Sequence, residues 1–242
     1  MKRTYKENIY DKYFSHHTQK LYGEISLSRI EKSFPILSYY FDKHLPNKKD
    51  SKIVDLGCGM GDFIYWLTTK GYSNTLGIDI SMELITKGRK LKITNLECKD
   101  IFSFLKDKAN EFDLVIMRDV IEHFDKEETY ELISNLYKAL TQSGSVIIQT
   151  PNGQSPFVGK ILFGDFTHYQ AFTDSSINQL FSSIGFKNIN IYEVGPVPKN
   201  LKGRIRLFTW VILKIIFKIG QIIATGDSSG YYSPNIIAII KK

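Results

Sequence analysis

The sequence predicts an α/β fold, a doubly wound parallel sheet covered by helices. Short, continuously apolar, β-branched runs recur after residue 50, which is typical of strands buried on both faces of such a sheet. Segments with recognisable helix ends separate the first of these runs, and parallel neighbours need such crossovers. With 242 residues, 43% of them hydrophobic, the chain has the length and composition of one globular domain.

The N-terminal segment is predicted to be helical, with no strand before residue 50. Apolar side chains recur there at helical spacing: Leu27, Ile30, Phe34, Leu37 and Phe41. We expect residues 25–44 to be helical, with Pro35 either kinking the helix or opening a second one. Residues 1–50 are therefore expected to form a helical cap.

Seven strands are predicted after the cap. Their ranges are 52–57, 74–80, 95–98, 112–118, 144–150, 187–194 and 235–242. The helix at 60–70 ends at Gly71, and the helix at 82–90 begins after Ser81. Asp125 caps a helix that runs to about Leu140, and Glu128 completes a capping box.

The second half of the chain departs from this alternation. Residues 151–172 are too long for an ordinary connection, which makes them a candidate functional loop. A helix capped by Thr173 and ended by Gly185 follows, and a basic apolar insertion at about 199–225 separates the last two strands. We interpret 1–242 as one domain, with a ligand-binding core at 51–150 and an acceptor-side half at 151–242.

Charge is unevenly distributed along the chain, although the net charge is +7. Residues 1–50 carry 10 basic against 6 acidic side chains and residues 195–242 carry 8 against 1, while the centre is acidic. Basic ends suit a phosphorylated substrate, a membrane surface or nucleic acid, or they are solvated lysines on surface helices.

Cys58 and Cys98 are expected to be free thiols. The start lacks a leader-like apolar run and lysines interrupt the long apolar stretch, so we expect a cytoplasmic protein without a span.

A glycine-rich turn with acidic neighbours ends the first strand: VDLGCGMGDF, residues 54–63. Such a turn lets a ligand approach the backbone closely, but Asp62 replaces the third glycine of the dinucleotide fingerprint. Asp55 and Asp62 would repel a diphosphate by about 1–4 kcal/mol per close pair, and the turn holds no basic residue. S-adenosylmethionine carries a positively charged ammonium and sulfonium, so the same carboxylates would attract it.

Two further carboxylates suit the nucleoside part of this ligand. Asp79 lies 22 residues after Gly57, which is the spacing of a side chain that accepts both ribose hydroxyls. Asp100, after the third strand, is placed to accept from the adenine amino group.

The chain resembles class I S-adenosylmethionine-dependent methyltransferases, particularly the ubiquinone-biosynthesis-like branch. The resemblance rests on VDLGCGMG, GIDIS, CKDIF, FDLVIMRDVIEHF and LTQSGSVIIQTPN in this order, within residues 52–152. It implies a Rossmann-like, seven-stranded, mostly parallel sheet whose last strand is antiparallel. It also implies the cofactor contacts: Gly57, Cys58 and Gly59 at the methionine, Asp79 and Ile80 at the ribose, Asp100 and Ile101 at the adenine, Arg118 and Asp119 facing sulfonium and substrate.

Methyl transfer to a hydroxyl needs alignment and a base that removes the proton. His168 is the first candidate because the long loop places it on the ligand side, and Asp165 is expected to orient it or to contact the acceptor. His123 is the second candidate, and lining the site wall is the alternative role for both. Residues 165–186 resemble a segment of methyltransferases that act on bacterial surface polysaccharides. Asp119, Asp165 and His168 are conceivable ligands, but without a recognised signature we assign no metal.

Residues 201–220 are predicted to form a basic amphipathic helix. Lys202, Arg206, Lys214 and Lys218 recur at multiples of four, with aliphatic side chains on the other side. Three interpretations stay open: a packed lid or homodimer face at the acceptor site, peripheral contact with the inner face of an anionic membrane, or a core helix.

The sequence thus favours O-methylation of a small sugar-like or phosphate-linked acceptor in bacterial surface-glycan assembly, such as capsule or lipopolysaccharide. A quinone or phenolic lipid precursor is the alternative acceptor. A nicotinamide-dependent oxidoreductase is disfavoured by the acidic turn. No nucleic-acid partner is expected, because the basic helix interleaves charge with aliphatic rather than stacking side chains and MRDVIEH lacks the Pro-Pro-Tyr-type motif of base-amine methylation.

Overall fold

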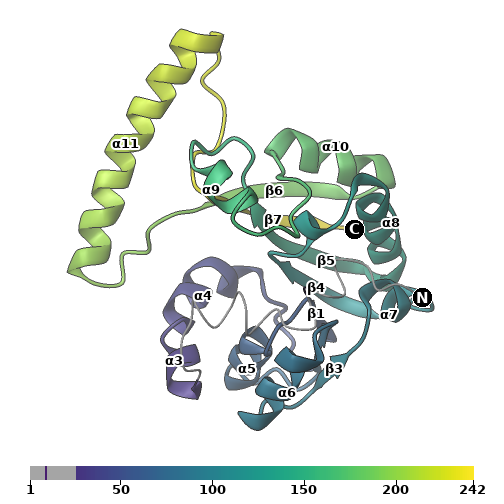
Figure 1. Ribbon diagram of the computed structural model, residues 1–242. Coiled ribbons are helices and arrows are strands. Elements are labelled where there is room, and N and C mark those ends of the chain that lie inside the picture. The colour runs from purple at the N-terminus through teal and green to yellow at the C-terminus, as the bar shows by residue number, and fades with distance from the viewer. Residues whose placement is uncertain (1–8, 10–25) are drawn as a thin grey trace.

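The computed structural model describes residue 9 and residues 26–242. Its centre is a seven-stranded sheet in the order β3-β2-β1-β4-β5-β7-β6 (Figure 1). β7 is antiparallel to β5 and β6, and all other neighbours are parallel, as predicted. The strands are Ile53–Leu56 (β1), Thr75–Asp79 (β2), Leu96–Cys98 (β3), Phe112–Arg118 (β4), Leu140–Pro151 (β5), Lys187–Val194 (β6) and Asn235–Lys241 (β7).

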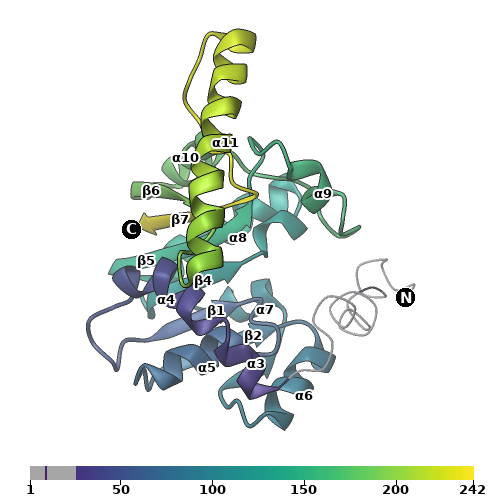
Figure 2. The same cartoon turned by 90° about the vertical axis from the view of Figure 1, so that its left-hand side faces the viewer.

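Helices cover both faces of this sheet (Figures 1 and 2). One face carries Leu27–Glu31 (α3), Phe34–Phe41 (α4), Asp62–Thr69 (α5) and Met82–Lys90 (α6). The other carries Ile101–Leu105 (α7), Lys126–Ala139 (α8) and Asp174–Ile184 (α10). Short 3-10 turns at Asp42–His44 (η2) and Ile121–His123 (η3), the short helix Val158–Leu162 (α9) and the long helix Leu201–Thr225 (α11) complete the described part of the chain.

The N-terminal helical segment is split in two. Pro35 lies in the first turn of α4, where its fixed φ suits the helix and its missing N–H leaves no intrahelical bond unmade. Of the two alternatives for Pro35, opening a second helix is therefore confirmed. The rest of the predicted cap, residues 1–8 and 10–25, lies outside the described residues.

Two boundaries differ from the prediction for local reasons. The first crossover helix begins at Asp62 instead of residue 60, because Gly57, Gly59 and Gly61 all have positive φ, which interrupts a right-handed helix. β5 begins at Leu140 instead of residue 144, because Leu140 already pairs with Phe112 across a register shift.

The basic insertion forms α11, and this helix projects from the sheet (Figures 1 and 2). Of its 25 residues only Gly203 is buried. The interpretation as a core helix is therefore wrong. Within the described residues, α11 is the one helix long and apolar enough by composition to cross a membrane.

Candidate active site

The carboxyl ends of β1, β2 and β4 meet at one edge of the sheet, since these strands are parallel neighbours. Open α/β sheets bind their ligands at this edge. The glycine-rich turn follows β1, Asp79 ends β2, and Asp119 follows β4. Three predicted site elements that are far apart in the sequence therefore lie together.

The glycine-rich turn is held by β2 and leaves space on its ligand side. The backbone N–H groups of Gly57 and Cys58 donate to the carbonyl of Ile78, at 2.8 and 3.0 Å. A Cβ at Gly57 would lie 2.4 Å from Val120 Cγ2, so this position tolerates no side chain. A Cβ at Gly59 would meet no described atom within 4 Å. Gly57 therefore serves packing, and Gly59 borders open space.

Asp79 ties this turn to the end of β2. Its Oδ2 accepts from the N–H of Gly59 and its Oδ1 from that of Ser81, both at 2.8 Å. Burial raises the pKa of Asp79, and these two backbone donors act to lower it. Each oxygen keeps a second lone pair, with which it can accept from a hydroxyl. That Asp79 binds the two ribose hydroxyls stays a prediction. Ile80, the next residue, is half exposed at this edge.

Asp55 is a carboxylate buried near the end of β1. Both of its oxygens are inaccessible to solvent and neither has a partner among the described residues. Burial raises its pKa to about 7, with Arg118 acting against this rise and Asp62 and Asp79 adding to it. A buried, unpartnered acid at a ligand edge fits a cationic ligand group, and the ammonium of S-adenosylmethionine is one.

The tertiary fold brings a basic residue, Arg118, to the turn, which holds none itself. Arg118 Nη2 donates to Asp62 Oδ1 at 2.9 Å, and its guanidinium lies 4.7 Å from the centre of the Phe63 ring. Arg118 is thus held in an ion pair. The acidic side chains still outnumber it, since Asp55 and Asp79 also lie at this edge.

Cys58 turns its side chain into the protein. Its thiol is buried, and a Cβ at Gly77 would lie 2.8 Å from its Sγ. The side chain therefore packs on the next strand, and contact of Cys58 with the methionine moiety stays a prediction.

Asp100 and Ile101 begin α7. Asp100 Oδ1 accepts from the N–H of Ser103 at 2.8 Å, so this side chain is a helix N-cap, and Ile101 is buried. Contacts of either residue with adenine stay predictions.

Asp119 has a backbone conformation that non-glycine residues rarely adopt. Its φ is 56° at the end of β4. Gln149 Nε2 donates to Asp119 Oδ2 at 2.9 Å, and Asn235 Nδ2 donates to Oδ1 at 3.2 Å. Left-handed residues cluster at functional sites, where surrounding contacts hold them. Gln149 and Asn235 were not among the predicted site residues, although both lie at predicted strand ends on this edge.

Two imidazoles meet beside these strand ends. The rings of His123, in η3, and His168, in the 151–172 loop, have centroids 4.6 Å apart. His168 Nδ1 lies 3.2 Å from the carbonyl oxygen of Ile161, which can only accept, so Nδ1 carries the proton. In neutral His168, Nε2 therefore has the free lone pair that a base needs.

Asp165 reaches His123 through a hydroxyl. Asp165 Oδ1 accepts from both the N–H and the hydroxyl of Thr167, at 2.9 and 2.7 Å. The Thr167 oxygen lies 2.8 Å from His123 Nδ1. This chain of contacts links Asp165 to the second candidate base. That Asp165 orients His168 or contacts the acceptor stays a prediction.

Glu122 lies under the histidine pair. It is fully buried, Oε2 accepts from the Thr150 hydroxyl at 3.1 Å, and Oε1 has no partner among the described residues. Burial, followed by the charge of Asp119, raises its pKa well above the usual value, which favours the neutral acid. One ligand atom each from Glu122, His123 and His168 lie within 4.8 Å of one another, a donor set that suits a divalent transition metal. The ligands considered from the sequence were Asp119, Asp165 and His168, and only His168 belongs to this group.

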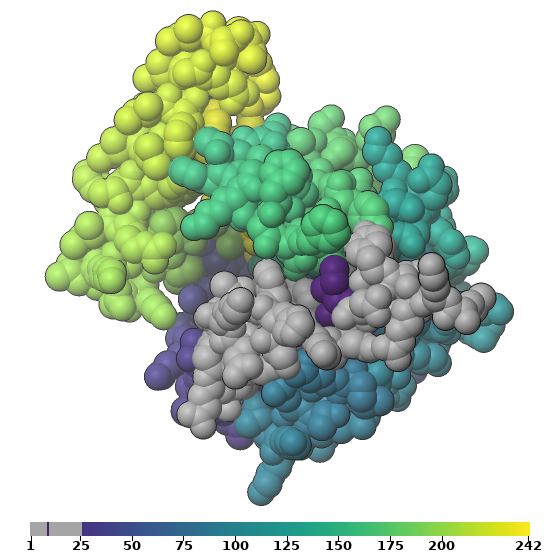
Figure 3. Space-filling model, viewed as in Figure 1, coloured from purple at the N-terminus to yellow at the C-terminus, as the bar shows by residue number. Residues whose placement is uncertain are grey.

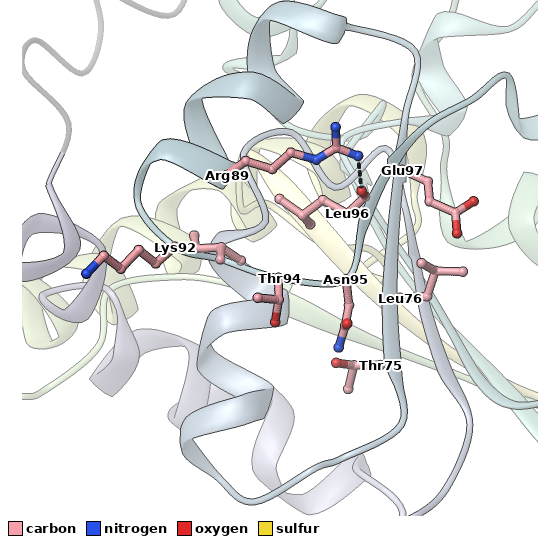
Figure 4. Close-up of a pocket in the computed structure, with 9 residues that line it drawn as sticks. Thr75, Leu76, Arg89, Lys92, Thr94, Asn95, Leu96 and Glu97 are labelled. Carbon is pink, nitrogen blue, oxygen red and sulfur yellow. Dashed lines mark hydrogen bonds between the residues drawn. The ribbon is translucent and has the colours of Figure 1, made fainter.

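A surface hollow elsewhere belongs to the opposite edge of the sheet. Thr75, Arg89, Asn95 and Glu97 line it, near the starts of β2 and β3 (Figure 4). Arg89 there donates to the Leu96 carbonyl at 2.7 Å. None of the predicted site residues lines this hollow.

Comparison with known proteins agrees with this geometry. A family model described as a methyltransferase domain matches residues 28–191. A phosphoethanolamine N-methyltransferase of Plasmodium falciparum is 29% identical over 53% of this chain and 48% of its own length. A ubiquinone biosynthesis O-methyltransferase of Rickettsia bellii is 30% identical over 48% and 50%. A crystal structure of an S-adenosylmethionine-dependent methyltransferase from Archaeoglobus fulgidus, 22% identical, matches with a TM-score of 0.68 over 96% of this chain and all of its own.

The fold is the one that S-adenosylmethionine-dependent methyltransferases of known structure share. The chain belongs to the methyltransferase domain family, whose model covers more than half of it. It spans about half the length of the curated relatives that it matches.

Proposed function

We propose that this protein transfers a methyl group from S-adenosylmethionine to a hydroxyl of a small sugar-like or phosphate-linked acceptor in bacterial surface-glycan assembly. The observation that carries the oxygen assignment is the His123–His168 pair, 4.6 Å between ring centroids, close to Asp119 at the cofactor edge. A hydroxyl must lose a proton to attack, and an imidazole with a free Nε2 accepts one.

Within this proposal the residues divide the work. Bound S-adenosylmethionine supplies a methyl group on a positively charged sulfur. The rest of the molecule then leaves with that sulfur as a neutral thioether. The buried Asp55 favours the ammonium through its charge, Asp79 holds the ribose, and Asp119 faces the acceptor. His168 Nε2 takes the hydroxyl proton as the oxygen–carbon bond forms and the carbon–sulfur bond breaks. Glu122 and the Asp165–Thr167 pair position His123 beside His168.

The test is turnover of sugar nucleotides and phosphate-linked sugars, measured as release of S-adenosylhomocysteine. We expect His168→Ala to lower turnover by roughly 10²- to 10⁴-fold with unchanged cofactor affinity. His44→Ala is the matched control, because His44 lies in η2, outside this cluster. Unchanged turnover in His168→Ala would remove His168 as the base. Methylation of an amine acceptor alone would replace the oxygen assignment, and the Plasmodium relative is named for such chemistry.

Chelation separates proton removal by imidazole from metal activation. We expect turnover to survive dialysis against a chelator. Loss of turnover that Mn²⁺ or Zn²⁺ restores would instead assign Glu122, His123 and His168 as metal ligands.

A quinone or phenolic lipid precursor is the second candidate acceptor. The exposed apolar side of α11 favours a lipid acceptor, because this helix lies next to the 151–172 loop that carries His168. Phe157 of that loop packs on the helix. The rickettsial relative is named for ubiquinone biosynthesis. Turnover of a phenolic lipid, with none of the sugar acceptors, would select this candidate.

A further inference from the structure

α11 packs on the rest of the protein with one side only. Its inner side places Phe217 5.9 Å from Phe157, centroid to centroid, and Trp210 6.5 Å from the same ring. Lys214 pairs with Glu193 at 2.5 Å. At both ends the helix is capped, by Asn200 and by the left-handed Gly226. The helix is thus a well-formed element of about 38 Å.

Its outer side is a broad apolar surface, which we call the outer stripe. At 3.6 residues per turn, its members fall within an arc of about 120° opposite Trp210. Each is between 44% and 81% exposed: Leu201, Ile205, Phe208, Ile212, Ile216, Ile219, Ile222 and Ile223. In the space-filling view the helix forms a ridge beside the body (Figure 3). An exposed apolar patch of this extent indicates an interaction site.

The sheet topology rules out a membrane-spanning orientation of α11. Val194, before the helix, and Asn235, after it, are paired neighbours in β6 and β7. Both ends of the helix must therefore return to the same edge of the sheet. The return segment 226–234 has nine residues, a reach of about 32 Å at most, and it contains Asp227. It would have to cross about 30 Å of hydrocarbon as non-helical backbone, which lipid does not tolerate.

Charge favours a lipid surface over a second copy of the chain. α11 contains Lys202, Arg204, Arg206, Lys214 and Lys218 and no acidic residue. Arg204 lies at the border of the outer stripe and Lys202 and Lys218 flank it, so these long basic side chains reach phosphate headgroups while the stripe enters the acyl boundary. Two copies that met through the outer stripe would instead bring like charges together.

We propose that α11 lies in the plane of an anionic membrane, with the outer stripe in the headgroup–acyl boundary. The inner side stays on the protein, so the 151–172 loop that carries Asp165 and His168 is held near the membrane surface through Phe157. This proposal does not depend on which acceptor is methylated.

The test is sedimentation of the full chain with phosphatidylcholine vesicles, with and without phosphatidylglycerol. We expect binding that requires phosphatidylglycerol and weakens with salt. The Ile212→Glu/Ile216→Glu double variant should lose about tenfold or more of the affinity. Tyr130→Glu, a similarly exposed apolar position on α8, is the matched control and should bind as the parent does. Unchanged S-adenosylmethionine binding shows that each variant is folded.

A second measurement locates the helix in the bilayer. In Phe208→Trp, the new indole should shift to shorter emission wavelength on binding and be quenched by lipids brominated on their acyl chains. Absence of binding by the parent chain, or emission unaffected by vesicles, would overturn the proposal. So would a lipid-independent dimer that Ile212→Glu/Ile216→Glu dissociates, because the outer stripe would then be a protein interface.

Discussion

At the scale of single residues, Asp55 links the cofactor to pH. Its pKa of about 7 in the unliganded protein lies above its ordinary value of 3.8, so the carboxyl group is mostly protonated below pH 7. A cationic ligand binds the carboxylate better than the acid. Binding therefore releases a proton, and affinity for S-adenosylmethionine should rise with pH by up to about tenfold per unit as the pH approaches 7.

This dependence can be measured by calorimetry between about pH 5.5 and 7.5, where the ligand's own α-amino group stays largely protonated. Asp55→Asn should bind more weakly at pH 7.5 and with an affinity nearly independent of pH. An unchanged slope in Asp55→Asn would show that another group takes up the proton.

Some of these residues could be predicted from the sequence and others could not. Asp79 and Gly59 are found by their places at strand ends, because parallel strands bring their carboxyl ends together. The Arg118–Asp62 pair and the Thr167 bridge to His123 join residues 56 and 44 positions apart through tertiary packing, and no local pattern encodes them.

At the scale of elements, the helix ends are the most predictable feature. Asp125 accepts from the Glu128 N–H at 2.8 Å, and the Glu128 side chain accepts from the Asp125 N–H at 3.0 Å. This reciprocal box was visible in the sequence, as was the Thr173 cap and the left-handed Gly185 end of α10. The short α7 and α9 escaped prediction because five residues show little periodicity.

The capping box supports a stability prediction. Asp125→Ala should lower the free energy of unfolding by about 1 kcal/mol, because the backbone N–H of Glu128 loses its side-chain acceptor at the start of α8. Urea denaturation at neutral pH measures the change. Lys126→Ala, one position on and exposed, should have little effect. Equal effects of the two substitutions would mean that the box contributes nothing.

At the scale of the whole molecule, the sheet order explains how the parts combine. The parallel strands bring the cofactor residues to one edge, and the antiparallel β7 returns the chain there with Asn235 against Asp119. The same return makes α11 an insertion between paired strands. Its apolar outer side was visible as a pattern, but only the topology distinguishes lying on a membrane from crossing one.

The open space beside Gly59 is where we expect S-adenosylmethionine to bind. Gly59→Ala and Gly71→Ala form a matched pair, because both glycines have positive φ, 58° and 85°, and neither Cβ would meet a described atom within 4 Å. Both substitutions should therefore carry a similar backbone strain of about 1–2 kcal/mol. Gly71 follows α5, whose start is at the site edge and whose end is not.

Calorimetric titration of S-adenosylmethionine into the parent chain and this pair is the most direct measurement. We predict binding to the parent and to Gly71→Ala with similar affinity, and a loss of at least about tenfold in Gly59→Ala. No heat of binding to the parent, or equal affinity in the two variants, would contradict the placement of the cofactor at this edge.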